Sequence, residues 1–184
     1  ETGERMSTAE VKANLLAFFF AGQETTSTVL TWALYLLSQS PQWRARVTAE
    51  AQQVPEGPIE HAADRLVQTR AVVEEAMRLY PPIVGITRSA AAGARLGAHT
   101  LARRTMVIVS PYVLHRHRLL WTDPDLFDPG RFLTGGLNRH AYLPFGVGPR
   151  MCIGAAFAMQ EAVLAVAMVM KRYTLALAPG QKVW

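Results

Sequence analysis

Long apolar stretches interrupted by short polar breaks predict a chain made mainly of helices. Ser7 and Glu10 have the Ser-x-x-Glu spacing of a capping box, and no proline follows before position 41, so a first helix is expected over 7–39. A helix this long, and apolar on most faces, is typical of the centre of a large domain. Ser40 has the residue type of an N-cap, before a second helix expected over 41–53.

The middle of the chain carries shorter signals. The stretch "VPEGP" ends the second helix, and Asp64 is of the type that caps the next one, which is expected to end at Tyr80 before two prolines. Small residues and glycines then separate three expected strands, at 83–90, 94–101 and 105–110.

The last third of the chain begins with one expected helical turn at 111–117. Residues 118–150 contain prolines and glycines without periodicity, and a stretch of this kind inside a compact domain is usually functional. A final helix is expected over 153–173. The fold class that these elements predict is mostly α with small β-sheets (α+β).

Composition narrows the class of protein. Apolar residues make up 50% of the 184-residue chain, which is enough for a substantial core. The net charge of +5 comes without a long basic run, so we expect no nucleic-acid partner. The single cysteine cannot form an internal disulfide. The polar first residues do not form a signal peptide, and the end lacks a closing element, so we expect a piece of a larger cytoplasmic protein.

Two stretches, 13–37 and 153–170, are apolar enough to be tested as membrane spans. Glu24 falls near the middle of the first, where a carboxylate costs about 2.5–3.5 kcal/mol on insertion scales. Gln160 and Glu161 interrupt the second. We therefore expect buried helices and no membrane span.

The only cysteine, Cys152, lies in "FGVGPRMCIG" and has three readings. It is a buried core residue, a nucleophile that would need His140 as its base, or a metal ligand. One thiolate suffices for a metal only if a porphyrin supplies the other ligands. A thiolate where a helix begins would be stabilised by free backbone N–H groups, and the glycines at 146 and 148 allow a tight turn that aims those groups at sulfur.

The neighbours of the cysteine fit the porphyrin reading. Gly154 leaves room for a flat ring, Phe145 is placed to cover the sulfur, and Arg150 is placed to bind a propionate. This segment resembles the haem-binding signature of the cytochrome P-450 family. The five fixed positions of that signature are Phe145, Gly148, Arg150, Cys152 and Gly154.

Three further segments resemble the same family and follow its order. They are "AGQETTS" at 21–27, like the oxygen-activating segment of the long central helix, "EEAMR" at 74–78, which has the Glu-x-x-Arg pair, and "FDPGRF" at 127–132. The resemblance covers nearly the whole chain, but only the C-terminal half of the family's fold, so 1–184 is expected to be a partial cytochrome P-450 domain without its N-terminal half and extreme C-terminus.

The resemblance implies a role for each matching residue. Cys152 is the axial ligand of haem iron, and haem b is the cofactor. Thr25 holds a water near bound dioxygen and conducts protons with Glu24. Ala21 and Gly22 are small, so the cofactor can approach the backbone of the helix. Arg88 and Arg150 contact haem propionates, and Phe145, Gly146, Gly148 and Gly154 shape the cysteine loop. Glu75, Arg78 and Arg131 are structural and hold that loop. His115 stands where the family often has a histidine. Two interpretations stay open: it has the role of that family histidine, or it is an ordinary loop histidine.

The function that the resemblance implies is monooxygenation. One atom of O2 would enter a C–H or C=C bond of a small apolar organic substrate. Val84, Gly85 and Ile86 would border the substrate pocket. Electrons would come from a ferredoxin or reductase, which would meet basic residues such as Arg139 and Arg150. Two alternatives remain: a truncated, inactive fragment that does not retain haem, and a family member that uses peroxide without O2.

Overall fold

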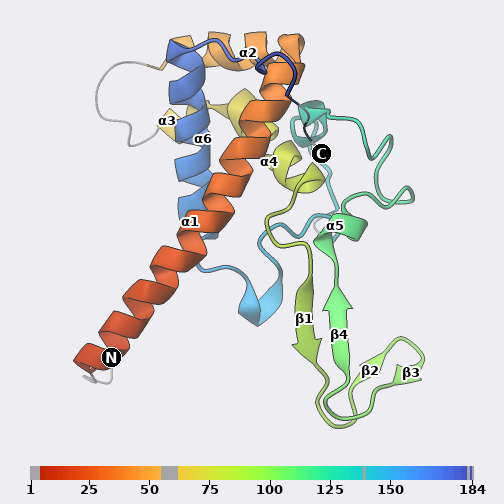
Figure 1. The fold of residues 1–184 in the computed structure, drawn as a ribbon. Helices are drawn as coiled ribbons and strands as arrows, with labels where there is room; N and C mark the ends of the chain where they lie inside the picture. Colours follow the sequence, from red (N-terminus) through yellow and green to blue (C-terminus); the bar gives the residue numbers. More distant parts are fainter. Residues whose placement is uncertain (1–4, 55–61, 139, 182, 184) are drawn as a thin grey trace.

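The computed structural model describes residues 5–54, 62–138, 140–181 and 183, and it is mostly helical, with two small antiparallel sheets (Figure 1). The mostly α class with small sheets is therefore confirmed. The helices are α1 (Thr8–Gln39), α2 (Pro41–Gln52), α3 (Ala62–Arg65), α4 (Val67–Leu79), α5 (Pro111–Leu114) and α6 (Ala155–Arg172), with 3-10 turns at Pro129–Phe132 and Gly148–Arg150. The strands are β1 (Ile86–Ser89), β2 (Arg95–Leu96), β3 (His99–Thr100) and β4 (Met106–Val109).

Helix α1 begins with the expected capping box. The Ser7 hydroxyl accepts a hydrogen bond from the Glu10 amide at 3.3 Å, and the Glu10 carboxylate accepts one from the Ser7 amide at 2.7 Å. Two backbone N–H groups that have no partner within the helix are thereby bonded.

One of the two expected caps is confirmed. Ser40 is the N-cap of α2 with Pro41 as its first residue, although the Ser40 side chain makes no capping hydrogen bond. Asp64 lies inside α3 and does not cap α4, whose N-cap is Leu66. A leucine side chain has no hydrogen-bond acceptor, and the Glu50 carboxylate of α2 accepts the amides of Gln68 and Thr69 instead, at 2.7 and 2.8 Å. A residue 18 positions upstream therefore caps α4, and the packing of α2 on α4 makes this possible.

The strand expected over 94–101 is instead a hairpin. β2 pairs with β3 around Gly97, whose φ of +57° is accessible to glycine at little cost. β1 and β4 pair antiparallel with Ile86 opposite Val109, close to the expected segments 83–90 and 105–110.

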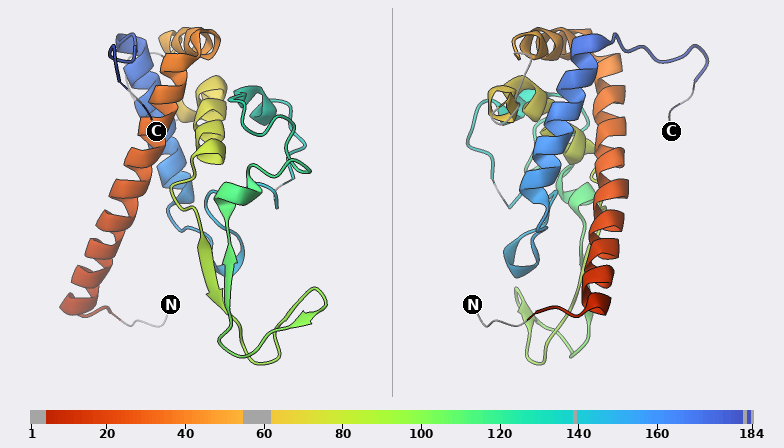
Figure 2. Two further views of the ribbon diagram at one scale, coloured as in Figure 1. Left: turned by 45° about the vertical axis from the view of Figure 1, so that its right-hand side comes forward. Right: turned by 90° about the vertical axis from the view of Figure 1, so that its left-hand side faces the viewer.

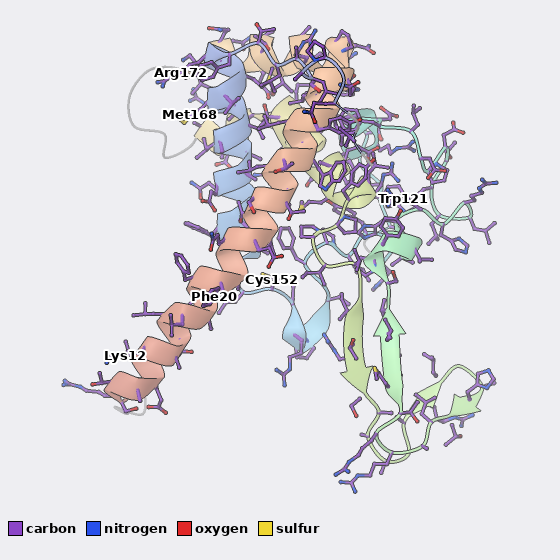
Figure 3. The ribbon with its side chains drawn as sticks, viewed as in Figure 1. Lys12, Phe20, Trp121, Cys152, Met168 and Arg172 are labelled. Atoms are coloured by element: carbon purple, nitrogen blue, oxygen red, sulfur yellow. The ribbon has the colours of Figure 1, made fainter. Side chains whose placement is uncertain are left out.

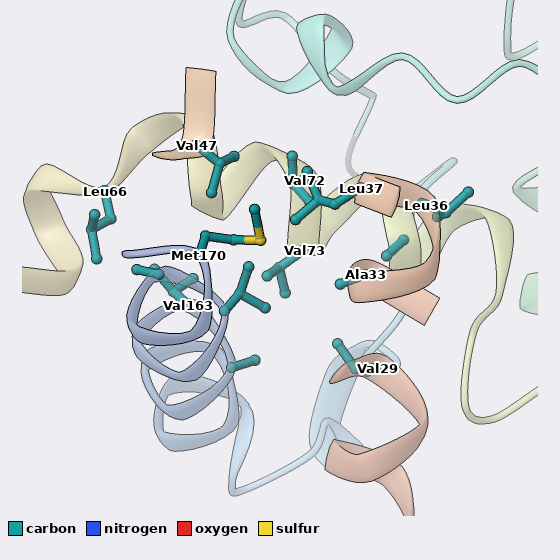
Figure 4. Close-up of a cluster of buried hydrophobic side chains, with 14 of the residues drawn as sticks. Val29, Ala33, Leu36, Leu37, Val47, Leu66, Val72, Val73, Val163 and Met170 are labelled. Atoms are coloured by element: carbon teal, nitrogen blue, oxygen red, sulfur yellow. The ribbon is translucent and has the colours of Figure 1, made fainter. Parts of the chain in front are cut away.

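The core lies where α1, α2, α4 and α6 meet. Leu37 from α1, Val47 from α2, Val72 from α4 and Val163 from α6 are fully buried and converge in the cluster of Figure 4. Outside this cluster, Trp32 of α1 stacks on Tyr80 at the end of α4, with ring centroids 3.7 Å apart. These contacts fix α4 in the middle of the helical body, so its polar face is held in place.

The N-terminal half of α1 lies outside this core. The buried residues of α1 are Val29, Ala33, Leu36 and Leu37, while Phe18, Phe19 and Phe20 are 60–67% exposed. Figure 1 and both views in Figure 2 show this half of α1 projecting from the helical body, in the same direction as the β1–β4 ribbon. The expectation of a helix buried along its length is therefore wrong for this chain, because no other described element packs against residues 8–24.

None of the described helices is both long and apolar enough to cross a bilayer.

Shortening a leucine side chain should affect stability unequally in the two halves of α1. Leu37→Ala should lower the free energy of unfolding of this chain by about 2–5 kcal/mol, because Leu37 is fully buried. Leu15→Ala, on the same helix but 63% exposed, should change it by no more than about 0.5 kcal/mol. Denaturant unfolding of the 184-residue chain measures both, and equal losses would contradict this packing.

Candidate functional site

A fully buried ion pair on α4 contacts the segment that follows α5. Arg78 Nε and Nη2 donate to the two carboxylate oxygens of Glu75 at 2.6 and 2.8 Å, and both side chains are 0% exposed. A buried pair is stable only when its remaining hydrogen-bonding groups also find partners. The expectation that this pair is buried, and not a surface pair, is confirmed.

All five N–H donors of Arg78 have acceptors. Besides the two bonds to Glu75, Nη1 donates to the carbonyls of His115 and Pro124 at 2.9 and 2.6 Å, and Nη2 donates to the carbonyl of Leu126 at 3.1 Å. The guanidinium also lies 5.1 Å from the centre of the Trp121 ring. The Arg78 side chain thus binds three backbone carbonyls between residues 115 and 126.

Arg131 adds a third charged group to the pair. Its Nε lies 3.4 Å from Glu75 Oε1, and its Nη1 and Nη2 donate to the carbonyls of Thr122 and Asp123. Glu75 Oε1 also accepts the amide of Asp128 at 2.8 Å. The expected contact between Arg131 and the pair is confirmed, and it joins the start of the first 3-10 turn to α4.

The cysteine segment follows as a glycine turn. Gly146 and Gly148 have φ of +74° and +75°, a region in which residues with a Cβ are strained. The Gly146 amide donates to the Leu143 carbonyl at 3.2 Å, and the Cys152 amide donates to the Phe145 carbonyl at 2.9 Å. The tight turn expected from the glycines is therefore formed, and it closes back on Phe145.

The surroundings of the sulfur differ from expectation. Cys152 is exposed, so it is not a buried core residue. α6 begins at Ala155 with Gly154 as its N-cap, and no hydrogen bond reaches Cys152 Sγ from any described residue. Two of the nearby amides have other acceptors, since Ala155 donates to the carbonyl of Cys152 and Met151 donates to that of Gly148. Figure 3 shows Cys152 on the stretch that leads into α6.

The residues around the sulfur fit a flat, apolar metal complex. A Cβ added to Gly154 would lie 3.9 Å from Cys152 Sγ, so the glycine keeps the side of the sulfur open. Ile153 and Phe157 are 88% and 72% exposed beside it, and such an apolar surface suits a porphyrin face. Among the described residues, no group of three or more His, Cys, Asp or Glu is arranged to hold a bare metal ion. Phe145 packs against the core instead of standing free.

The candidate acid–alcohol pair lies on the exposed half of α1. Thr25 is half-buried, and its hydroxyl donates to the Ala21 carbonyl at 2.7 Å, the i−4 bond expected of a helical threonine. Ala21, Gly22 and Glu24 are exposed, and a Cβ on Gly22 would meet nothing within 4 Å. The expectation that this is the most buried turn of the helix is therefore wrong in this chain.

The remaining candidates are only partly brought together. Arg88 is exposed on β1 and donates to the carbonyl of Thr87, and Arg150 is exposed in the second 3-10 turn. The turn touches β1, since a Cβ on Gly146 would lie 3.7 Å from Ile86 Cδ1. No hydrogen bond joins the described side chains of His140 and Cys152. Arg139 lies outside the described residues.

A cavity of about 490 Å³ lies behind the cysteine turn, between α3, α4 and the start of α6, lined among others by Arg70, Glu74, Tyr142 and Phe145. Burial raises the pKa of Glu74, and Arg70 opposes this shift. The Tyr142 hydroxyl donates to the Glu74 carbonyl at 2.9 Å, and burial also raises the pKa of Tyr142. Residues of both the cysteine turn and α4 therefore line this cavity.

The sequence did not reveal several residues that support the site. Trp121 and Tyr142 pack on one another and on Arg78 or α4, and their only signal was their aromatic character inside an otherwise irregular segment. The three carbonyls that Arg78 binds carry no sequence signal, because every residue has one. His115, which the sequence singled out while leaving its role open, is fully buried.

Comparison with known proteins agrees with the segments described above. A family model described as Cytochrome P450 matches residues 1–184. Cyclooctatin synthase from Streptomyces melanosporofaciens is 42% identical over 188 residues, which cover 100% of this chain and 41% of that protein. Cyclooctat-9-en-7-ol 5-monooxygenase from the same organism is 38% identical, over 98% of this chain and 40% of that protein. Secologanin synthase 1 from Catharanthus roseus is 35% identical, over 95% of this chain and 35% of that protein. The chain thus spans 35–41% of the length of these relatives.

The buried network predicts a large effect from a substitution that keeps its charge. Arg78→Lys should lower the free energy of unfolding by about 3–5 kcal/mol, because lysine leaves buried carbonyls and a carboxylate oxygen without donors. Asp125→Asn is the matched control, since Asp125 is 76% exposed and lies 3.7 Å from Arg116, a geometry worth at most about 1 kcal/mol. Chemical denaturation compares the two, and a tolerated Arg78→Lys would contradict the role of the network.

Proposed function

The chain belongs to the cytochrome P450 family, and from that premise we propose that residues 1–184 are the haem-binding part of a haem-thiolate monooxygenase domain. The observation that carries the proposal is Cys152, whose sulfur is exposed on a glycine turn beside exposed apolar side chains. The monooxygenase named above, which is 38% identical, supports the same reaction class.

We assign the cofactor-binding roles as follows. Cys152 would hold haem b by binding its iron through the sulfur. Gly146, Gly148 and Gly154 give the turn its shape and keep it clear of side-chain bulk, and Phe145 anchors it to the core. The two exposed guanidinium groups, of Arg88 and Arg150, bind the propionates, and Ala21 and Gly22 present a side-chain-poor stretch of α1 toward the cofactor.

Haem bound through a thiolate supplies the electron-rich iron that favours cleavage of the O–O bond. The contribution of the chain is to hold and move protons. The Thr25 hydroxyl donates to the Ala21 carbonyl, so its oxygen can accept a hydrogen bond from a neighbouring water and hold that water in place. Glu24 is exposed next to it and exchanges protons with solvent. In the overall reaction, one oxygen atom enters a substrate C–H or C=C bond, and the other leaves as water with two protons and two electrons.

The substrate and electron donor are proposed by class. A small apolar organic molecule suits the exposed apolar residues Val84 and Ile83 and the half-buried Ile86. A ferredoxin or reductase is the proposed source of the electrons. The cytoplasmic location stays a prediction.

A second reading is favoured by the share of the relatives that the chain covers. The 184 residues alone are an inactive fragment that does not retain haem, since the apolar half of α1 is uncovered. The Soret absorbance of the purified 184-residue polypeptide separates the two readings. Use of peroxide without O2 is the less favoured alternative, because Glu24 and Thr25 are both present.

Replacing the sulfur tests the central assignment. In the full natural polypeptide that contains these residues, Cys152→Ala should abolish the thiolate-type ferrous–CO spectrum, because no other described cysteine exists to replace it. Met151→Ala, a neighbouring exposed change, should leave that spectrum in place. A thiolate-type spectrum in Cys152→Ala would refute the ligand.

Removing the helix hydroxyl tests the proton path. Thr25→Ala should uncouple NADPH consumption from product by roughly 10-fold or more and raise peroxide release, a loss in the range of a lost general acid–base group. Thr28→Ala is the matched control, because Thr28 makes the same type of i−4 bond, to the Glu24 carbonyl at 2.9 Å. If both variants stay coupled, or both uncouple equally, Thr25 has no special role.

A further inference from the structure

His115 is a fully buried titratable residue that the proposed chemistry does not use. It is the C-cap of α5, and its own amide donates to the Pro111 carbonyl at 2.8 Å. Its ring lies 5.2 Å from that of Tyr142, between the end of α4 and the segment that precedes the cysteine turn.

His115 makes one hydrogen bond to each of two separate parts of the site. Its carbonyl accepts Nη1 of Arg78 at 2.9 Å, which ties its backbone to the buried ion pair. Its ring nitrogen Nε2 accepts the backbone amide of Leu143 at 2.8 Å. The Leu143 carbonyl accepts the amide of Gly146, and Cys152 is held in turn by Phe145. Hydrogen bonds, linked by short stretches of backbone, therefore connect α4 through His115 to the cysteine turn.

We propose that His115 is a positioning residue whose neutral imidazole, by accepting the Leu143 amide at Nε2, holds the cysteine turn in register with the Glu75–Arg78 pair. The bond is a property of the polypeptide, and only its consequence for the sulfur rests on the proposed function. An amide donor facing Nε2 requires that this nitrogen carry no proton, so the proton of the neutral ring is on Nδ1.

The charges around the ring favour the neutral form. The pKa of His115 falls from 6.5 to about 4, with burial as the largest cause and the nearby cations Arg78 and Arg116 acting in the same direction. The carbonyls of Met77 and Arg78, in the last turn of α4, act in the opposite direction, although Nδ1 is outside hydrogen-bonding geometry to any described acceptor. Tyr142 faces the ring as a neutral group, because burial raises its pKa.

The sign of the pH dependence follows from this shift. The folded chain binds the proton with a pKa of about 4 and the unfolded chain with a value near 6.5. Between these values the unfolded state binds more protons, so the contribution of His115 is complete above pH 6.5 and is lost as pH falls toward 4. Protonation also gives Nε2 a hydrogen that faces the Leu143 N–H, which breaks the bond.

Two substitutions separate the position of the acceptor from the presence of a polar group. The Gln side chain can place its oxygen near the position of Nε2, whereas the Asn side chain places it near Nδ1. In the full natural polypeptide, His115→Gln should keep slow hydrogen exchange at the Leu143 amide and should weaken the loss of thermal stability between pH 6.5 and 4. His115→Asn should speed exchange at Leu143 at least 10-fold and lower the thiolate-ligated fraction of haem.

A neighbouring histidine provides the matched control. His117 is exposed, and its Nδ1 accepts the amide of Leu119 at 3.3 Å, so His117→Gln should leave Leu143 exchange and the acid profile unchanged. Equal exchange at Leu143 in His115→Asn and wild type would overturn the proposal, as would equal losses in the Gln and Asn variants. Failure of haem binding with slow Leu143 exchange intact would instead count against the proposed function.

A measurement on the wild type covers the case in which the variants do not fold. Nitrogen-15 NMR of labelled histidine should show His115 as the Nδ1–H tautomer, still neutral at pH 5.5. An Nε2–H tautomer, or a charged ring at that pH, would overturn the proposal.

Discussion

The Arg78 guanidinium is the constraint on which the rest of this structure depends. It is fully buried, pairs with Glu75, and uses its other donors on carbonyls at 115, 124 and 126. An irregular segment cannot hold its own backbone by helix or sheet bonds, so a buried group with five donors takes their place. Arg131 and the Asp128 amide bind the same carboxylate, which brings the first 3-10 turn into the network. The segment without periodicity is therefore tied to α4 by side-chain hydrogen bonds to its backbone.

The network supports the cysteine turn without touching it. From α4 the connection continues through His115 and Leu143 to the glycines, while Tyr142 binds α4 through the Glu74 carbonyl. The site thus combines a rigid, buried support with an exposed sulfur. That combination suits a residue that must be held at a fixed position yet remain accessible to a large cofactor.

The sequence predicted the local elements well where the signal was local. The capping box at Ser7 and the glycine turn before α6 appear as expected, because both depend on residues within a few positions of one another. Prediction failed where the partner came from elsewhere in the fold. Glu50 of α2 caps α4, and the expected Asp64 is not its N-cap. The hairpin at 94–101 was missed for a different reason, because the turn at Gly97 is local but was not recognised. The exposure of Phe18–Phe20 was also missed, since apolar character in a sequence predicts burial but does not supply the surface that covers it.

The sequence by itself determined the family, and it singled out Cys152 and the three charged residues of the network, because these depend on residue types at fixed spacings. Only the tertiary structure decided which carbonyls Arg78 binds, that His115 contributes its ring to Leu143, and that the turn around Thr25 stays exposed in this chain. The physical reason is that backbone carbonyls and buried positions are common to all sequences, and which of them meet a given side chain is set by packing between elements far apart in the chain.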